Sequence, residues 1–199
     1  MSRKGAIMTR KNLPKLIVGV VVLVFVVAGA MFFVGKAQAP STAVTGVATS
    51  EAVVVGDATE DSSTEQLKYL IEEEKLAHDV YTKMYELYGA RVFGNILKSE
   101  STHQDSVLTL LNARGIADPR TSEVGTFNNT ELQQLYDSLI AKGEQSAADA
   151  YEVGVAIEEK DIADISTQLE TAQDEDIITT LESLRRGSEN HLRAFNRQL

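Results

Sequence analysis

The most informative segment of the sequence is Phe93-Gly-Asn-Ile-Leu-Lys-Ser-Glu-Ser-Thr-His-Gln-Asp-Ser-Val-Leu-Thr-Leu-Leu111. At helical spacing, one stripe of this segment is apolar at both ends and polar at its centre, where Glu100 and His103 stand. A helix places these two residues on one face, about one turn apart. Burying an isolated carboxylate is costly because the group loses its hydration. A metal ion is the simplest compensation, provided that other helices supply further ligands.

Three other segments also have a helical period that polar residues interrupt near the middle. All four segments, with the residues that interrupt them, are 63–89 with Glu74, 92–113 with Glu100 and His103, 147–171 with Glu158 and Asp161, and 174–197 with Ser188 and His191. Ser63 or Thr64 can cap the first helix, Gly89 can end it, and Ser146 can cap the third. The chain is therefore expected to form four long helices from residue 63 onward.

The connections between these helices predict their topology. The links between the first and second helices and between the third and fourth are short, whereas 115–145 is long and holds a short helix at about 130–142, with Gly143 as its expected C-cap. Two helical hairpins joined by one long crossover form the ferritin-like topology. We therefore predict an all-α, ferritin-like four-helix bundle with a long crossover between helices 2 and 3.

Mid-helix positions of an antiparallel bundle lie at similar heights, so the interrupting residues are expected to meet in one layer. Four carboxylates there would repel one another, and their pKa values would rise. One or two divalent cations would compensate this charge. A set of oxygen and imidazole donors without thiolate suits iron or manganese, with zinc as an alternative. The predicted metal ligands are Glu74, Glu100, His103, Glu158, Asp161 and His191. Glu73, Glu159 and Glu189 lie one position off the stripes and are expected on the surface; the alternative is that one of them replaces its neighbour as a ligand.

The N-terminal part of the chain differs in composition from the rest. Residues 1–15 are basic, and 16–35 form an uncharged apolar run that is long enough to cross a bilayer. Five positive charges precede this run, which predicts a cytoplasmic N-terminus, a transmembrane helix at 16–35, a flexible linker at 36–62 and an extracytoplasmic domain at 63–199. A cleaved signal peptide is the alternative, because Ala37-Gln-Ala39 resembles a cleavage site, although Pro40 follows it.

Charge and cysteine content exclude several functions. The chain has no cysteine, which excludes disulfides, iron–sulfur clusters, thiol catalysis and cysteine-bound zinc. The net charge is −10, and the part after Lys36 has 13 basic and 29 acidic residues, or −16. Such an acidic domain is not expected to bind nucleic acid, because the phosphate backbone requires basic side chains.

Several phrases of the sequence resemble the DUF2202 family, a ferritin-like domain of unknown function. They are Glu72-Glu-Glu-Lys-Leu-Ala77 with Asp79-Val-Tyr81, Phe93-Gly-Asn-Ile96, Ser99-Glu-Ser-Thr-His103, Leu135-Tyr136, Val153-Gly154 with Ile157-Glu-Glu-Lys-Asp-Ile162, and Gly187-Ser-Glu-Asn-His-Leu-Arg-Ala-Phe195. The resemblance extends from about Thr64 to Leu199.

A looser resemblance is to rubrerythrin-type di-iron sites, whose Glu-x-x-Ala-x-x-x-Tyr pattern is similar to Glu74, Ala77 and Tyr81. The fourth helix departs from that family, because Ser188 stands three residues before His191 where the family has glutamate. Asp161 or a water molecule can fill this position, or the site can hold a single metal ion.

Two classes of function follow. The first is oxidoreductase, peroxide or ferroxidase chemistry at a metal centre, with electrons from an external donor protein or from substrate iron. The alternative is a non-enzymatic, cell-surface binding module with a structural metal or none. A homo-oligomer is compatible with both. Iron storage is disfavoured, because a membrane anchor on each chain would hinder assembly of a closed shell.

Overall fold

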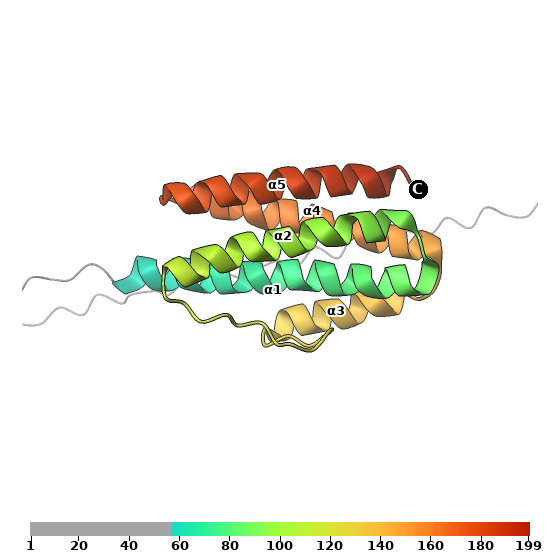
Figure 1. Ribbon diagram of the computed structural model, residues 1–199, viewed down its shortest axis with the longest axis horizontal. Coiled ribbons are helices and arrows are strands. Elements are labelled where there is room, and N and C mark those ends of the chain that lie inside the picture. The colour runs from blue at the N-terminus through green and yellow to red at the C-terminus, as the bar shows by residue number, and fades with distance from the viewer. Residues whose placement is uncertain (1–56) are drawn as a thin grey trace, which may run out of the picture. The chain divides into compact units, whose positions relative to one another are not determined.

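The structure is a computed structural model that describes residues 57–199. This part of the chain forms five helices and no strand (Figure 1): α1 (Asp57–Tyr88), α2 (Arg91–Ala113), α3 (Thr130–Gly143), α4 (Ala147–Thr171) and α5 (Glu175–Asn196). The predicted all-helical class is confirmed. The predicted transmembrane helix at 16–35 lies outside the described residues. Among α1–α5, no helix combines the length and the apolar character needed to span a membrane.

The four long helices form two antiparallel hairpins, α1 with α2 and α4 with α5 (Figure 1). The hairpins pack side by side, so that α1 lies against α4 and α2 lies against α5. The predicted third and fourth helices are thus α4 and α5. The short helix α3 belongs to the long crossover and packs outside the four helices, against α1 and α4.

Local sequence signals account for several helix ends. Gly89 follows α1 with φ = 61°, a left-handed conformation that glycine adopts at little cost. The Ser146 hydroxyl accepts a hydrogen bond from the backbone N–H of Asp149 and caps α4. Two boundaries differ from prediction. Helix α1 begins at Asp57, before the expected cap, and Gly143 lies inside α3, where its carbonyl accepts a hydrogen bond from the Tyr88 hydroxyl at 2.8 Å.

The apolar core consists of two clusters. One contains Leu76, Tyr81, Phe93, Ile157 and Phe195 and lies toward the α1–α2 turn. The other lies toward the α4–α5 turn and contains, among others, Leu67, Ile71, Val107, Ile165 and Leu184. Along every long helix, the polar residues that interrupt the stripe fall between the members of these two clusters. A polar layer thus crosses the middle of the bundle.

Candidate metal centre

All six predicted ligands lie in this polar layer and are buried. Glu74 comes from α1, Glu100 and His103 from α2, Glu158 and Asp161 from α4, and His191 from α5. Their exposed fractions are 2% for Glu74, Glu100 and Glu158, 6% for Asp161 and 7% for His103 and His191. The helical period therefore placed these residues correctly.

Glu100 lies between the two imidazole rings. Its Oε1 atom is 2.8 Å from Nδ1 of His191, and its Oε2 atom is 3.4 Å from Nδ1 of His103. The two rings lie nearly parallel, with centroids 5.4 Å apart and an interplanar angle of 26°. One carboxylate therefore offers a separate oxygen to each histidine.

The other carboxylates complete two groups that share Glu100. Glu74 Oε2 lies 3.1 Å from Nδ1 of His103, and Glu158 Oε1 lies 3.5 Å from Nδ1 of His191. In each group of three residues, one ligand atom per residue lies within 4.8 Å of the other two. Each group supplies two carboxylates and one imidazole nitrogen, and Glu100 can bridge between them.

Several buried polar atoms of the layer have no hydrogen-bond partner among residues 57–199. In the layer itself they are Glu74 Oε1, Glu100 Oε1, Asp161 Oδ1 and His191 Nδ1. Although Glu100 Oε1 and His191 Nδ1 are only 2.8 Å apart, their geometry is not that of a hydrogen bond. Leaving such atoms unpaired costs about 1–3 kcal/mol each, more for charged groups. A metal ion bound between Glu100 Oε1 and His191 Nδ1 would give both of these atoms a partner.

Asp161 belongs to the layer but not to either group of three. The Ser188 hydroxyl donates a hydrogen bond to its Oδ2 atom, and its Oδ1 atom is unpaired. Ser188 itself is buried on α5, one turn before His191. The serine that departs from the rubrerythrin pattern therefore holds a carboxylate from the neighbouring helix α4.

Burial and mutual contacts shift the pKa values of the layer strongly. Burial raises the pKa of Glu74 to about 8 and that of Glu158 to about 7, and it raises the pKa of Asp161 well above its usual range. Burial alone would also raise the pKa of Glu100, but contact with the two imidazoles lowers it to about 2. Burial alone would lower the pKa of His191, but Glu100 and Glu158 raise it to about 9. The metal-free layer thus holds protons that a cation would displace.

A tyrosine contacts the layer from α1. Tyr81 is fully buried, and its hydroxyl donates a hydrogen bond to Glu158 Oε1 at 2.6 Å. Its ring packs against Phe93 and Phe195, with centroids 5.9 and 5.2 Å away. These contacts orient the Glu158 carboxylate, and they give the Tyr81 hydroxyl the partner that a buried phenol requires.

Glycine at position 187 makes room for one of the imidazoles. A Cβ atom on Gly187 would collide with Nε2 of His103 and would lie 2.6 Å from its Cε1 atom. The His103 ring therefore rests directly on the backbone of α5. Sequence reasoning had no signal for this contact, because the two residues come from different helices.

Sequence reasoning was wrong about Glu73, which was expected on the surface. It is only 4% exposed, because α4 covers this side of α1, and its Oε1 atom accepts a hydrogen bond from Lys160 Nζ at 2.5 Å. Its neighbour Glu72 is equally buried and accepts a hydrogen bond from the backbone N–H of Asn128 at 2.8 Å. Three consecutive glutamates on α1 thus point to the crossover, to α4 and to α2. The unbroken run of charged residues in the middle of α1 was the sequence feature that could have indicated the burial of Glu73.

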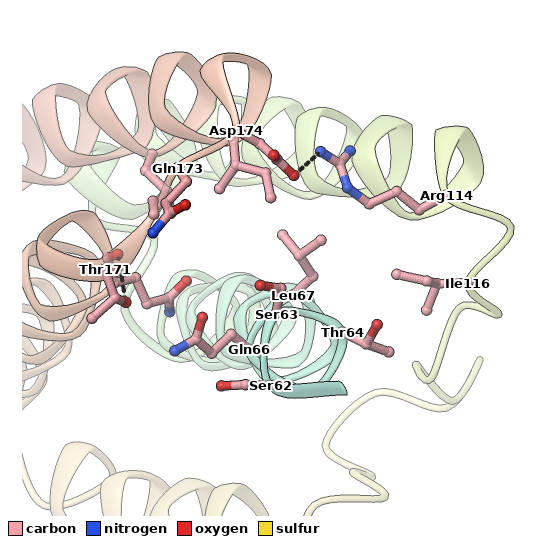
Figure 2. A pocket seen from close by; sticks show the side chains of 14 residues that line it. Ser62, Ser63, Thr64, Gln66, Leu67, Arg114, Ile116, Thr171, Gln173 and Asp174 are labelled. Atoms are coloured by element: carbon pink, nitrogen blue, oxygen red, sulfur yellow. Dashed lines mark hydrogen bonds and ion pairs between the residues drawn. The ribbon is translucent and has the colours of Figure 1, made fainter. Parts of the chain in front are cut away.

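A separate hollow lies away from the layer, at the end of the bundle that contains the α4–α5 turn (Figure 2). It has a volume of about 810 Å³, and its wall includes Ser63, Gln66 and Gln173. The guanidinium of Arg114 lies at its edge, 3.1 Å from Asp174 Oδ2. No predicted metal ligand lines this hollow, so it is not part of the candidate centre.

Comparison with known sequences and structures identifies the family. The family model for DUF2202, described as an uncharacterized protein domain, matches residues 63–199. The chain belongs to the DUF2202 family. It is 42% identical over 140 residues to the uncharacterized protein MJ0754 of Methanocaldococcus jannaschii, a match that covers 70% of this chain and 76% of that protein. The resemblance drawn from the sequence phrases is thereby confirmed at the level of the family.

Two crystal structures are similar in fold to this chain. The first is that of the hypothetical protein MJ0754 from Methanococcus jannaschii, with a TM-score of 0.68 and 38% identity over 79% of this chain and 85% of that one. The second is a conserved hypothetical protein, rv2844, from Mycobacterium tuberculosis, with a TM-score of 0.56 and 20% identity over 72% of this chain and all of that one. The second likeness concerns the fold alone.

Proposed function

We propose that this DUF2202 protein is a ferritin-like metalloprotein that holds one or two iron or manganese ions, or alternatively zinc, in its polar layer. The observation that carries the proposal is the position of Glu100, which presents one oxygen to each imidazole in the buried layer. Glu74 and His103 would hold one ion with Glu100, and Glu158 and His191 would hold the other.

The charges of the layer support two divalent cations. Four carboxylates carry four negative charges when ionised, and two divalent cations would balance them with both imidazoles neutral. Oxygen and imidazole donors without thiolate match iron and manganese. Asp161, held by Ser188, would take the place of the fourth-helix carboxylate that rubrerythrin-like sites possess.

Iron or manganese in such a centre would supply reactions with dioxygen or peroxide, or oxidation of Fe(II). The contribution of the chain is to fix the donor atoms, to exclude water and to accept protons. The two apolar clusters above and below the layer shield it from bulk solvent. Because the chain has no cysteine, the electrons would come from another protein or from substrate iron.

Metal analysis of the purified full-length protein tests the proposal. We expect one to two equivalents of iron or manganese, most of which is lost in Glu100→Ala and in His103→Ala. Asp105→Ala is the matched control, because Asp105 is an exposed acid on the same helix. Metal content near zero in the wild type, with a melting temperature that ignores added Fe(II), Mn(II) and Zn(II), would refute the proposal.

A second measurement separates an enzyme from a binding module with a structural metal. Loaded protein is mixed with Fe(II) and dioxygen, or with peroxide and an electron donor, and consumption of the oxidant is followed. Turnover that disappears in Glu100→Ala supports an oxidoreductase. Retained metal without turnover favours the non-enzymatic module.

We also propose that the domain is tethered outside the cytoplasm by residues 16–35, on the basis of their length, their lack of charge and the basic residues before them. Membrane fractionation of cells that express the full-length chain tests this location. Recovery of the intact chain in the membrane fraction supports an anchor, whereas a shortened chain in the medium favours a cleaved signal peptide.

A further inference from the structure

A line of charged residues leads from the surface to the polar layer, between α1 and α4. Its outer member, Asp164, has a side chain that is 37% exposed, and Lys160 is 33% exposed. The inner member is Glu73, whose side chain is 5% exposed. Lys160 Nζ donates hydrogen bonds to Asp164, to Glu73 Oε1 at 2.5 Å and to the Tyr69 hydroxyl at 2.9 Å. Its ammonium group thus occupies a point where three oxygen atoms converge.

Besides Glu74 Oε1, two buried carboxylate oxygens on the two helices of this seam lack a hydrogen-bond partner within the described part of the chain. They are Glu73 Oε2 and Asp161 Oδ1. In sequence, Glu73 precedes the ligand Glu74, and Asp161 follows Lys160. Oxygens left unpaired between a surface lysine and the layer would bind a cation that passes between them.

The outer residues of this seam reach the surface, beyond the part of α1 that α3 and the crossover cover. Helix α3 lies along the part of α1 nearer its C-terminal end (Figure 1), and the crossover attaches to α1 at Glu72 through Asn128. Lys160 and Asp164 reach solvent beyond that point. Helices α1 and α4 are also less closely packed against each other than the two helices of either hairpin.

The geometry points to this seam as the route by which a divalent metal cation reaches the polar layer, with Glu73 as its transfer ligand and Lys160 as a cationic plug. The inference rests on the proposed function. The ammonium group repels an incoming cation while it is bound to Glu73, and its flexible stem lets it swing toward solvent. Glu73 and Asp161 would then offer oxygens to the cation before Glu74 and Glu100 do. If Lys160 had a purely structural role, its ammonium group would only neutralise the charge of Glu73.

The rate of metal uptake tests the route. Full-length protein is stripped with a chelator and mixed with Co(II), whose visible absorption reports binding by nitrogen and oxygen ligands. Lys160→Met removes the charge of the plug, and we expect uptake about tenfold faster than in the wild type. Glu73→Gln removes the charge of the transfer ligand and should slow uptake by about the same factor. The final amount of bound Co(II) should stay unchanged in both.

A control variant completes the experiment. Lys142→Met is the matched control, because Lys142 pairs with Glu152 at 2.8 Å on the surface, with both side chains about half exposed. Its uptake rate should equal that of the wild type. Unchanged rates in Lys160→Met and Glu73→Gln, at normal final binding, would overturn the route and leave the proposed centre intact. A wild-type protein that binds no Co(II) would overturn both.

Discussion

At the scale of single residues, the layer depends on side chains that would not themselves bind metal. Ser188 holds Asp161, Tyr81 holds Glu158, and Gly187 leaves room for the His103 ring. Residues that orient metal ligands typically affect metal affinity by about 10–100-fold. Their substitution therefore separates the geometry of the centre from the stability of the bundle.

Gly187→Ala should displace the His103 imidazole, because the new methyl group would collide with the ring. We expect metal affinity to fall by about 10–100-fold, as for other changes that misplace a ligand. Titration of stripped protein with Mn(II) measures this. Gly143→Ala is the control, since its methyl group would meet the flexible end of the Met84 side chain, in the apolar cluster away from the layer. Equal affinities in the two variants would contradict the role of Gly187.

Tyr81→Phe keeps the buried ring but removes the hydroxyl that donates to Glu158. The loss of this donor should weaken metal binding by about tenfold, without changing the number of ions bound. Tyr151→Phe is a matched control, because Tyr151 stacks on Phe93 in the same aromatic cluster but makes no hydrogen bond to a carboxylate of the described layer. Equilibrium titration of both variants checks the prediction, and a loss of equal size in Tyr151→Phe would count against it.

At the scale of elements, α1 organises the molecule, because it contacts α2, α3 and α4. Lys75 of α1 binds the crossover and holds it against this helix. Its Nζ atom donates to Asp79 at 2.5 Å and to the carbonyl of Glu123 at 2.9 Å, and it lies 4.5 Å from the centroid of the Phe127 ring. The charged residues at one side of α1 thus hold a loop in place and are not part of the metal layer.

Lys75→Met should therefore lower the stability of the fold more than a surface change would. Removing one partner of a buried ion pair costs about 3–5 kcal/mol, because the other charge stays buried. The loss should be at the lower end of that range, since Asp79 keeps its hydrogen bond from the backbone N–H of Gly125. Urea unfolding measures the change in free energy. In the control Lys142→Met, the exposed pair with Glu152 should contribute less than about 1 kcal/mol.

At the scale of the whole molecule, the buried layer links folding to pH. The folded-state pKa values of Glu74 and Glu158 are about 8 and about 7, above the ordinary value of 4.5. The folded, metal-free protein therefore retains protons that the unfolded chain releases, and its stability should fall as the pH rises from about 5 to 8. The raised pKa of His191 acts in the same direction, because its contribution is complete below 6.5 and is lost as the pH rises through about 9.

Metal should act in the opposite direction, because ligands bind a cation only after they release their protons. The melting temperature of stripped protein should fall between pH 5 and 8, while the increase caused by excess Mn(II) should grow over the same range. Thermal unfolding followed by circular dichroism, with and without Mn(II), measures both. An increase that is constant or shrinks with pH would show that the layer does not exchange protons for metal.

The sequence by itself determined the helices, the family and the membership of the polar layer. Helical period is a local property, so the interruptions at Glu74, Glu100 and His191 could be placed at one height without knowledge of any contact. The phrases shared with DUF2202 likewise identified the family over residues 63–199. The metal in the layer and the transmembrane helix at 16–35 remain predictions.

Only the tertiary structure decided which partner each charged residue has. Periodicity separates a buried stripe from an exposed one, but it cannot show that α1 is covered on three sides, and this is why Glu73 was misplaced. The contact between Gly187 and His103 and the bond between Ser188 and Asp161 each join two helices. Such contacts depend on the distance and rotation between packed helices, and neither quantity is encoded in the spacing of residues along one of them.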